Sequence, residues 1–192
     1  MRRALLLLAL TATVGCSLGD GGASIERSEL QRLVLQPDDV PRIFVLFDEG
    51  RQARADQPPG PRADPERFGR TEGWKARYRR PGSGRTSGPL VIESRVDVFA
   101  SVSGAEDDFV AAREELRGDG LGWHPIDEPG LGDESFAATF VQRRVRYYQV
   151  FWREDNATAA LHVNGFEGKL PLSDALRLAR KQQERLERAA ES

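Results

Sequence analysis

One stretch of this chain, residues 143–153, constrains the fold more than any other. In an extended conformation its apolar side chains fall on both faces: Val145, Tyr147 and Phe151 on one, and Tyr148, Val150 and Trp152 on the other. A strand that is apolar on both faces is typical of the interior of a sheet with other layers packed on each side. We therefore expect a central strand here, in a sheet that carries helices on its faces.

Period-two alternation of apolar and polar residues predicts further strands before and after this segment. Pro81-Gly82-Ser83-Gly84 favours a turn, and hence an antiparallel pair, between the strands that flank it. A first strand is expected near the N-terminus, where apolar residues on both sides indicate cover on both faces. The expected strands are 42–48, 74–79, 90–98, 135–142, 143–153 and 157–164, and 122–126 is a further, short candidate.

Three segments have the pattern of helices. The first is 25–35. The second starts at the capping-box pattern Ser103-Gly104-Ala105-Glu106 and ends at Gly118. The third, 172–189, has an apolar stripe that fades at Gln182 and Gln183 and consists of Leu172, Ala175, Leu176, Ala179 and Leu186. The expected fold class is α+β: a single antiparallel sheet of about six strands, packed with helices that include a long C-terminal helix.

The chain divides into a leader, a tether and one domain. Residues 1–15 are expected to be an export signal, 16–24 a flexible tether and 25–192 a single α+β domain. Near residues 49–70, prolines, glycines and charged residues leave little apolar surface to bury, so we expect a disordered loop there.

The leader ends at the only cysteine of the chain. Met1-Arg2-Arg3 is followed by an apolar run too short to span a membrane, and then by Thr13-Val14-Gly15-Cys16. This order resembles the signal of bacterial lipoproteins, in which the cysteine takes a diacylglycerol on sulfur and becomes the new N-terminus. The resemblance implies that Cys16 is the lipid attachment point. A single cysteine cannot form an internal disulfide, so the body must be stabilised by its hydrophobic core alone.

Charge is unevenly distributed along the chain. Residues 51–95 hold eleven basic and five acidic residues, whereas residues 96–134 hold two basic and eleven acidic. Two such blocks can neutralise each other across a fold, or the basic block can face an anionic partner such as lipid headgroups or a cell-wall polymer. Because the protein is expected to be exported, nucleic acid is not an expected partner.

No catalytic or metal-binding constellation stands out in the sequence. His124 and His162 are far apart in the chain, no Gly-x-Ser-x-Gly motif occurs, and neighbouring carboxylates such as Glu154 and Asp155 lie near turns. We expect no catalytic residues, no metal and no cofactor. The aromatic residues that could line a ligand pocket are Trp74, Tyr78, Trp123, Tyr148 and Trp152.

Three short motifs carry a further resemblance, over about residues 30–188. They are Asp38-Asp39-Val40-Pro41, Leu131-Gly132-Asp133-Glu134-Ser135 and Leu178-Ala179-x-x-Gln182. With this order of elements the body resembles PsbP-like domains and the extracellular sensor domains of mycobacterial membrane kinases. The resemblance implies a domain that binds or scaffolds rather than one that catalyses.

Together, these features predict a membrane-anchored extracytoplasmic lipoprotein that acts as a non-catalytic ligand-binding or sensor module. It is expected on the cell membrane or outer membrane, held through acylated Cys16, with an unknown small ligand or envelope protein as its partner. Two alternatives remain open at this point. One is an envelope scaffold that acts through interactions, and the other is an envelope hydrolase that uses paired carboxylates.

Overall fold

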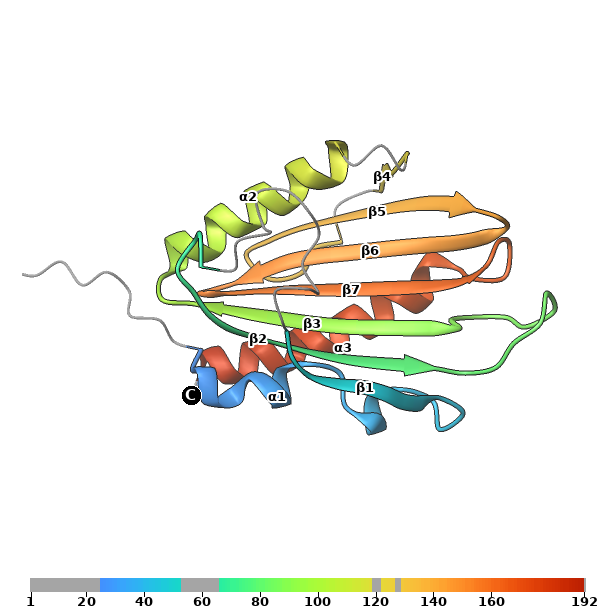
Figure 1. Cartoon of the computed structure of the whole chain (residues 1–192), viewed down its shortest axis with the longest axis horizontal. Helices are drawn as coiled ribbons and strands as arrows, with labels where there is room; N and C mark the ends of the chain where they lie inside the picture. The colour runs from blue at the N-terminus through green and yellow to red at the C-terminus, as the bar shows by residue number, and fades with distance from the viewer. Residues whose placement is uncertain (1–24, 53–65, 119–121, 127–128, 192) are drawn as a thin grey trace, which may run out of the picture.

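A computed structural model of the chain describes residues 25–52, 66–118, 122–126 and 129–191. They form one antiparallel sheet of seven strands, in the order β1-β2-β3-β7-β6-β5-β4, with three α-helices (Figure 1). The expected α+β class is confirmed, with seven strands where about six were expected.

The strands and the two later helices lie close to their expected positions, whereas the helix expected over 25–35 is reduced to a short 3-10 turn followed by a four-residue α-helix. The strands are β1 (Val45–Arg51), β2 (Arg70–Arg79), β3 (Val91–Phe99), β4 (His124–Ile126), β5 (Glu134–Gln142), β6 (Val145–Glu154) and β7 (Ala157–Phe166). The helices are α1 (Leu30–Leu33), α2 (Val102–Gly118) and α3 (Leu172–Ala190), with short 3-10 turns η1 (Arg27–Glu29) and η2 (Pro37–Asp39).

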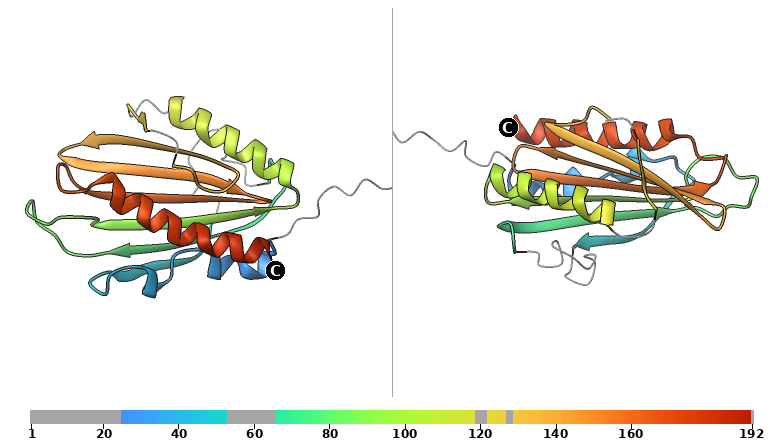
Figure 2. Two further views of the ribbon diagram at one scale, coloured as in Figure 1. Left: turned by 180° about the vertical axis from the view of Figure 1, so that it is seen from behind. Right: turned by 90° about the horizontal axis from the view of Figure 1, so that it is seen from above.

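The two faces of the sheet carry different helices. The edge-on view in Figure 2 shows α3 on one side and α2 on the other, and α1 lies beside α3. We call these the α3 face and the α2 face. The central strand β6 packs on both: Trp152 lies in the main core under α3, whereas Phe151 packs against Phe109 of α2. The prediction of a central strand with helices on both faces is therefore confirmed.

The α3 face carries most of the buried apolar surface. Its largest fully buried side chains include Trp152, Tyr78, Ile92, Leu161 and Leu186. Each buried side chain of this size contributes about 1.5–3 kcal/mol relative to an exposed one. The core can therefore stabilise the fold without a disulfide, as the single cysteine requires.

A series of buried hydrogen bonds holds α3 and the N-terminal segment against this face. Ser94 of β3 accepts a hydrogen bond from the Leu35 N–H at 2.9 Å and donates one to Gln182 of α3 at 2.8 Å. The Gln182 amide donates to the Arg95 carbonyl at 2.8 Å, and the Tyr78 hydroxyl donates to the Leu35 carbonyl at 2.6 Å. Gln182 is fully buried. The apolar stripe of α3 is interrupted at Gln182 because a buried polar contact replaces apolar packing at that position.

Two local expectations are wrong. Ser101, not Ser103, caps α2, because its hydroxyl accepts the hydrogen bond from the Gly104 N–H at 3.1 Å. The first strand is not covered on both faces: Ile43, Val45 and Phe47 are 57%, 62% and 37% exposed. The physical reason is position, since β1 is the outermost strand and α2 packs over the other half of the sheet.

The segment expected to be disordered, near 49–70, is only partly described. β1 continues to Arg51 and β2 begins at Arg70, so both strands extend into that range. Residues 53–65 lie outside the described part of the chain, as does the leader with Cys16.

Replacing Ser94 with Ala tests the buried polar chain. The change leaves the Leu35 N–H and the Gln182 carbonyl oxygen without their partner in a buried site, so we expect a loss of about 2–4 kcal/mol in the free energy of unfolding. Urea denaturation monitored by tryptophan fluorescence measures it. Ser173→Ala, on an exposed position of α3, is the control and should stay within about 0.5 kcal/mol of wild type. Equal stability of both variants would contradict this role for Ser94.

Candidate functional site

Cross-strand pairing aligns polar side chains in a row on the α2 face. The pairs Asp48–Arg77, Arg77–Glu93, Glu93–His162 and His162–Gln149 join β1, β2, β3, β7 and β6. Lys75 and Arg95 pair in the next row of the same face. Because alternate residues of β2 and β3, such as Tyr78 and Ser94, point to the α3 core, these polar residues point away from it. We call Asp48, Lys75, Arg77, Glu93, Arg95, Gln149 and His162 the polar belt.

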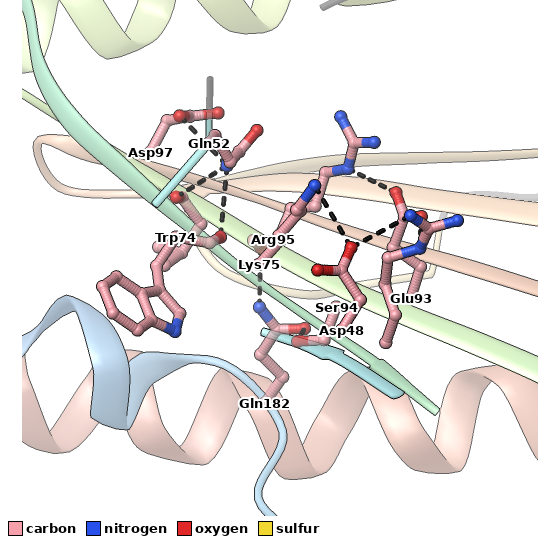
Figure 3. Close-up of polar contacts among 11 residues, drawn as sticks. Asp48, Gln52, Trp74, Lys75, Glu93, Ser94, Arg95, Asp97 and Gln182 are labelled. Carbon is pink, nitrogen blue, oxygen red and sulfur yellow. Dashed lines mark hydrogen bonds and ion pairs between the residues drawn. The ribbon is translucent and has the colours of Figure 1, made fainter. Parts of the chain in front are cut away.

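Ion pairs link the charged members of the belt (Figure 3). Asp48 lies 3.3 Å from the Lys75 ammonium and 3.0 Å from an Arg77 terminal nitrogen. Arg77 Nε lies 3.0 Å from Glu93 Oε2, and the other oxygen of Glu93 accepts from Arg95 Nε. The Arg77 Nε–H is buried and has the distance of an ion pair but not the geometry of a hydrogen bond. The belt is therefore a continuous network in which one donor of Arg77 is left unmatched within the described residues.

The belt is positively charged and only partly open to solvent. Three cations, Lys75, Arg77 and Arg95, face two carboxylates, Asp48 and Glu93, a net charge of +1 before His162 is counted. The side chains of Lys75 and Glu93 are only 10% and 15% exposed. Charges held this close to the sheet interact more strongly than they would in open solvent.

The environment shifts the pKa of both carboxyl groups in the same direction. Burial works against ionisation of Glu93, but the charges of His162, Arg95 and Arg77 outweigh it and lower its pKa below the ordinary 4.5. For Asp48 desolvation is the largest single effect and raises the pKa, but the hydrogen bonds and charges of Arg77 and Lys75 together outweigh it, so the pKa is also lowered. Both groups are held as carboxylates at neutral pH.

Two further groups of residues flank the belt on the α2 face. On one side, Arg70 lies 3.1 Å from Asp97, and Gln52 donates to Asp97 at 3.2 Å. Gly73 makes room for them, because a Cβ there would lie 2.0 Å from Asp97 Oδ1. On the other side, Phe140 stacks on Tyr147 with centroids 4.5 Å apart, in the row next to Gln149. The belt thus lies between a buried ion pair and an aromatic pair.

Helix α2 covers the neighbouring part of this face. Phe109 packs against Phe136 and Phe151, with ring centroids 5.5 and 5.9 Å apart, and Thr158 donates to Asp108 at 2.8 Å. Arg153 is buried and lies 2.7 Å from Asp133. These contacts account for part of the acidic block 96–134 as structural partners.

The aromatic residues named from the sequence do not gather around one pocket. Tyr78, Tyr148 and Trp152 are buried in the core under α3, and Trp74 is half-buried against it. Trp123 lies apart, against Phe140, with centroids 4.3 Å apart. Four of the five candidates therefore belong to the hydrophobic core, and Trp123 belongs to the aromatic residues beside the belt.

Sequence reasoning missed the belt. Each strand that contributes to it shows only an ordinary alternation of polar and apolar residues, and the pairing partners are far apart in the chain. Glu93 and His162, for example, become neighbours only when the register of β3 and β7 is known. The excess of basic residues in 51–95 was the one sequence feature that pointed to a basic surface, and it did not show which residues would form that surface.

The arrangement suits recognition of an anion. Guanidinium and ammonium groups that share a face bind carboxylates and phosphates, arginine often through two parallel hydrogen bonds. Within the described residues no group of His, Cys, Asp or Glu side chains could hold a metal ion. None of the described helices is long and apolar enough to cross a membrane.

Comparisons with known proteins give a likeness of fold. No protein-family model and no curated protein sequence matches this chain. Among solved structures, the fold is similar to the extracellular domain of PknH from Mycobacterium tuberculosis, with a TM-score of 0.64 and 10% sequence identity. The match covers 88% of this chain and 100% of that one. The expected likeness to mycobacterial extracellular domains is therefore supported at the level of fold.

Replacing Glu93 with Gln tests the electrostatics of the belt. Because the pKa of Glu93 is lowered in the folded chain, its carboxylate stabilises the fold above the ordinary pKa of 4.5, and this contribution is lost as the pH falls further. We expect Glu93→Gln to lower the free energy of unfolding by about 1–3 kcal/mol at pH 7, and by less at pH 3. Urea denaturation at both values measures the difference.

Glu154→Gln is the matched control. Burial raises the pKa of Glu154, with Asp133, Glu187 and Asp155 adding to the effect against a hydrogen bond from Gln183. Its ionisation therefore opposes folding, and the neutral amide should cause no loss of stability at pH 7. A loss of stability for Glu93→Gln that is the same at pH 3 and pH 7 would contradict the electrostatic role.

Proposed function

We propose that this chain is a membrane-anchored extracytoplasmic lipoprotein whose folded body is a non-catalytic ligand-binding or sensor module. The observation that carries the proposal is the polar belt, a net-positive network on one face of a sheet whose fold is similar to an extracellular domain. We infer that its ligand is a small anion with carboxylate or phosphate groups. The ligand's oxygens would complement Lys75, Arg77 and Arg95.

The cost of the belt supports a role in binding. Compared with apolar residues of similar volume, partly buried ion pairs add little net stability, because desolvation offsets most of their attraction, although removing one partner of an existing pair is costly. The fold already has a large apolar core on the other face. Three cations and two carboxylates on five neighbouring positions are therefore better explained by recognition than by stability.

The position of Ile25 supports anchoring close to the membrane. Asn156 accepts from the Ile25 N–H at 3.0 Å and donates to its carbonyl at 3.1 Å, so the body begins at a fixed point at one end of the sheet. Eight residues lie between Cys16 and this point, and the nine peptide steps that join them reach at most about 30–32 Å. An acyl anchor at Cys16 would hold the body within that distance of the bilayer.

One preparation tests both parts of the proposal. The full-length protein is expressed in an exporting bacterial host, purified from the membrane fraction in mild detergent and measured by native mass spectrometry. We expect a covalent mass increase that maps to Cys16 and matches a diacylglyceryl group with or without an N-acyl chain. We also expect a smaller non-covalent mass that leaves on gentle activation.

The variants separate the two claims. Cys16→Ser should leave the membrane fraction on washing with high salt and keep the non-covalent mass. Arg95→Ala should stay in the membrane fraction through the same wash and lose that mass. A Cys16→Ser protein that stays in the membrane fraction after the salt wash would refute the anchor. A non-covalent mass that Arg95→Ala retains would refute the belt as the binding site.

A further inference from the structure

The turns at one end of the sheet carry a surplus of positive charge. This end, which we call the hairpin end, comprises residues 42–46, 79–90, 141–146 and 166–170 (Figure 1). Its one acidic residue is Glu167, against eight basic residues. Six of the eight are exposed and have no carboxylate within ion-pair distance among the described residues: Arg42, Arg79, Arg85, Arg143, Arg144 and Lys169.

Two of these arginines lie in the β5–β6 turn, where the backbone conformation is unfavourable for residues with long side chains. Gln142 and Val145 pair across it, so Arg143 and Arg144 form a two-residue loop, with φ of 50° and 65°. Such turns favour Asn-Gly, because positive φ is strained for residues with long side chains. Both arginines are exposed, and neither forms an ion pair within the described residues. The fold therefore gives no reason for arginine at either position.

Exposed apolar side chains lie at one corner of the same end. Val45 and Phe47 of the outermost strand β1 are exposed, as is Ile43, which follows Arg42 just before that strand. Val45 pairs with Arg79, and the Arg79 guanidinium lies 5.0 Å from the centre of the Phe47 ring. Apolar side chains bordered by arginines are typical of surfaces that enter the interface of a membrane.

We propose that the hairpin end docks on an anionic phospholipid bilayer, with its arginines at the phosphates and Ile43, Val45 and Phe47 in the interfacial layer. This contact goes beyond the proposed ligand-binding function and does not need acylation of Cys16. A soluble polyanion would use the cations but would leave the apolar corner exposed to water. The apolar corner therefore favours a bilayer over a polymer.

The geometry allows an anchored protein to make this contact. A ten-residue strand spans about 33 Å, so the hairpin end lies about that far from Ile25, at the opposite end of the sheet. The nine peptide steps from Cys16 to Ile25 reach at most about 30–32 Å. A body tilted onto its β1 edge can therefore touch the bilayer with its hairpin end while Cys16 stays in it.

Vesicle co-sedimentation tests the proposal with the full-length Cys16→Ser protein, which lacks the acylation site. The vesicles are either phosphatidylcholine alone or an equal mixture of phosphatidylcholine and phosphatidylglycerol. We expect binding to the mixed vesicles, weaker binding to the neutral ones, and a steep loss with added salt. Since a basic residue near the surface contributes roughly fivefold in affinity, Arg143→Asn with Arg144→Gly should weaken binding roughly 25-fold.

Controls separate binding from folding. The Asn-Gly pair relieves the strained turn, so this double variant should melt at the same temperature as the parent or a few degrees higher. Arg180→Gln with Arg188→Gln removes the same charge from the exposed side of α3 and should bind like the parent. Val45→Ser should weaken binding, whereas Val110→Ser, at a similarly exposed apolar site on α2, should not.

Three outcomes would overturn the proposal. The first is equal binding by the parent and the Arg143→Asn, Arg144→Gly variant. The second is equal loss in the α3 control, which would indicate a general effect of net charge. The third is binding to inorganic polyphosphate without binding to the mixed vesicles, which would assign the basic surface to a polymer.

Discussion

The hydrogen bonds that run from Leu35 through Ser94 to Gln182 are the contact on which the rest of this structure depends. They join the N-terminal segment, the middle of the sheet and α3 at one buried point. Each group in the chain is satisfied only while the others stay in place, so the contact specifies the docking of α3 as well as stabilising it. The large aromatic and aliphatic residues then pack around it on one face of the sheet.

The packing on the α3 face determines which side chains point to the α2 face. Because alternate residues of β2 and β3 supply the core, their charged neighbours are placed together on the α2 face, where Arg77 and Glu93 meet. Helix α2 packs over β6, β7 and β3 with a small cluster of aromatic rings around Phe109. The main apolar core and the surface proposed to bind the ligand thus lie on opposite faces of the sheet.

The sequence was informative where the signal is periodic. The apolar residues of 143–153 on both faces identified β6 as a central strand, and the alternation in 74–79 and 90–98 located β2 and β3. It was uninformative where the signal depends on register or on one specific contact. In the sequence, Gln182 interrupts the apolar stripe of α3. Its role as the hydrogen-bond partner of Ser94 follows only from the structure. The uncovered face of β1 likewise depends on strand order, which alternation does not encode.

The claim that the α2 face, rather than the α3 face, does the binding can be tested directly in cells. A photoreactive amino acid is placed at Gln149, on the belt, and in a second strain at Arg180, on the exposed side of α3. After irradiation, we expect a covalent adduct, seen as added mass on the purified protein, at position 149 and none at position 180. An adduct at position 180 with none at 149 would contradict it.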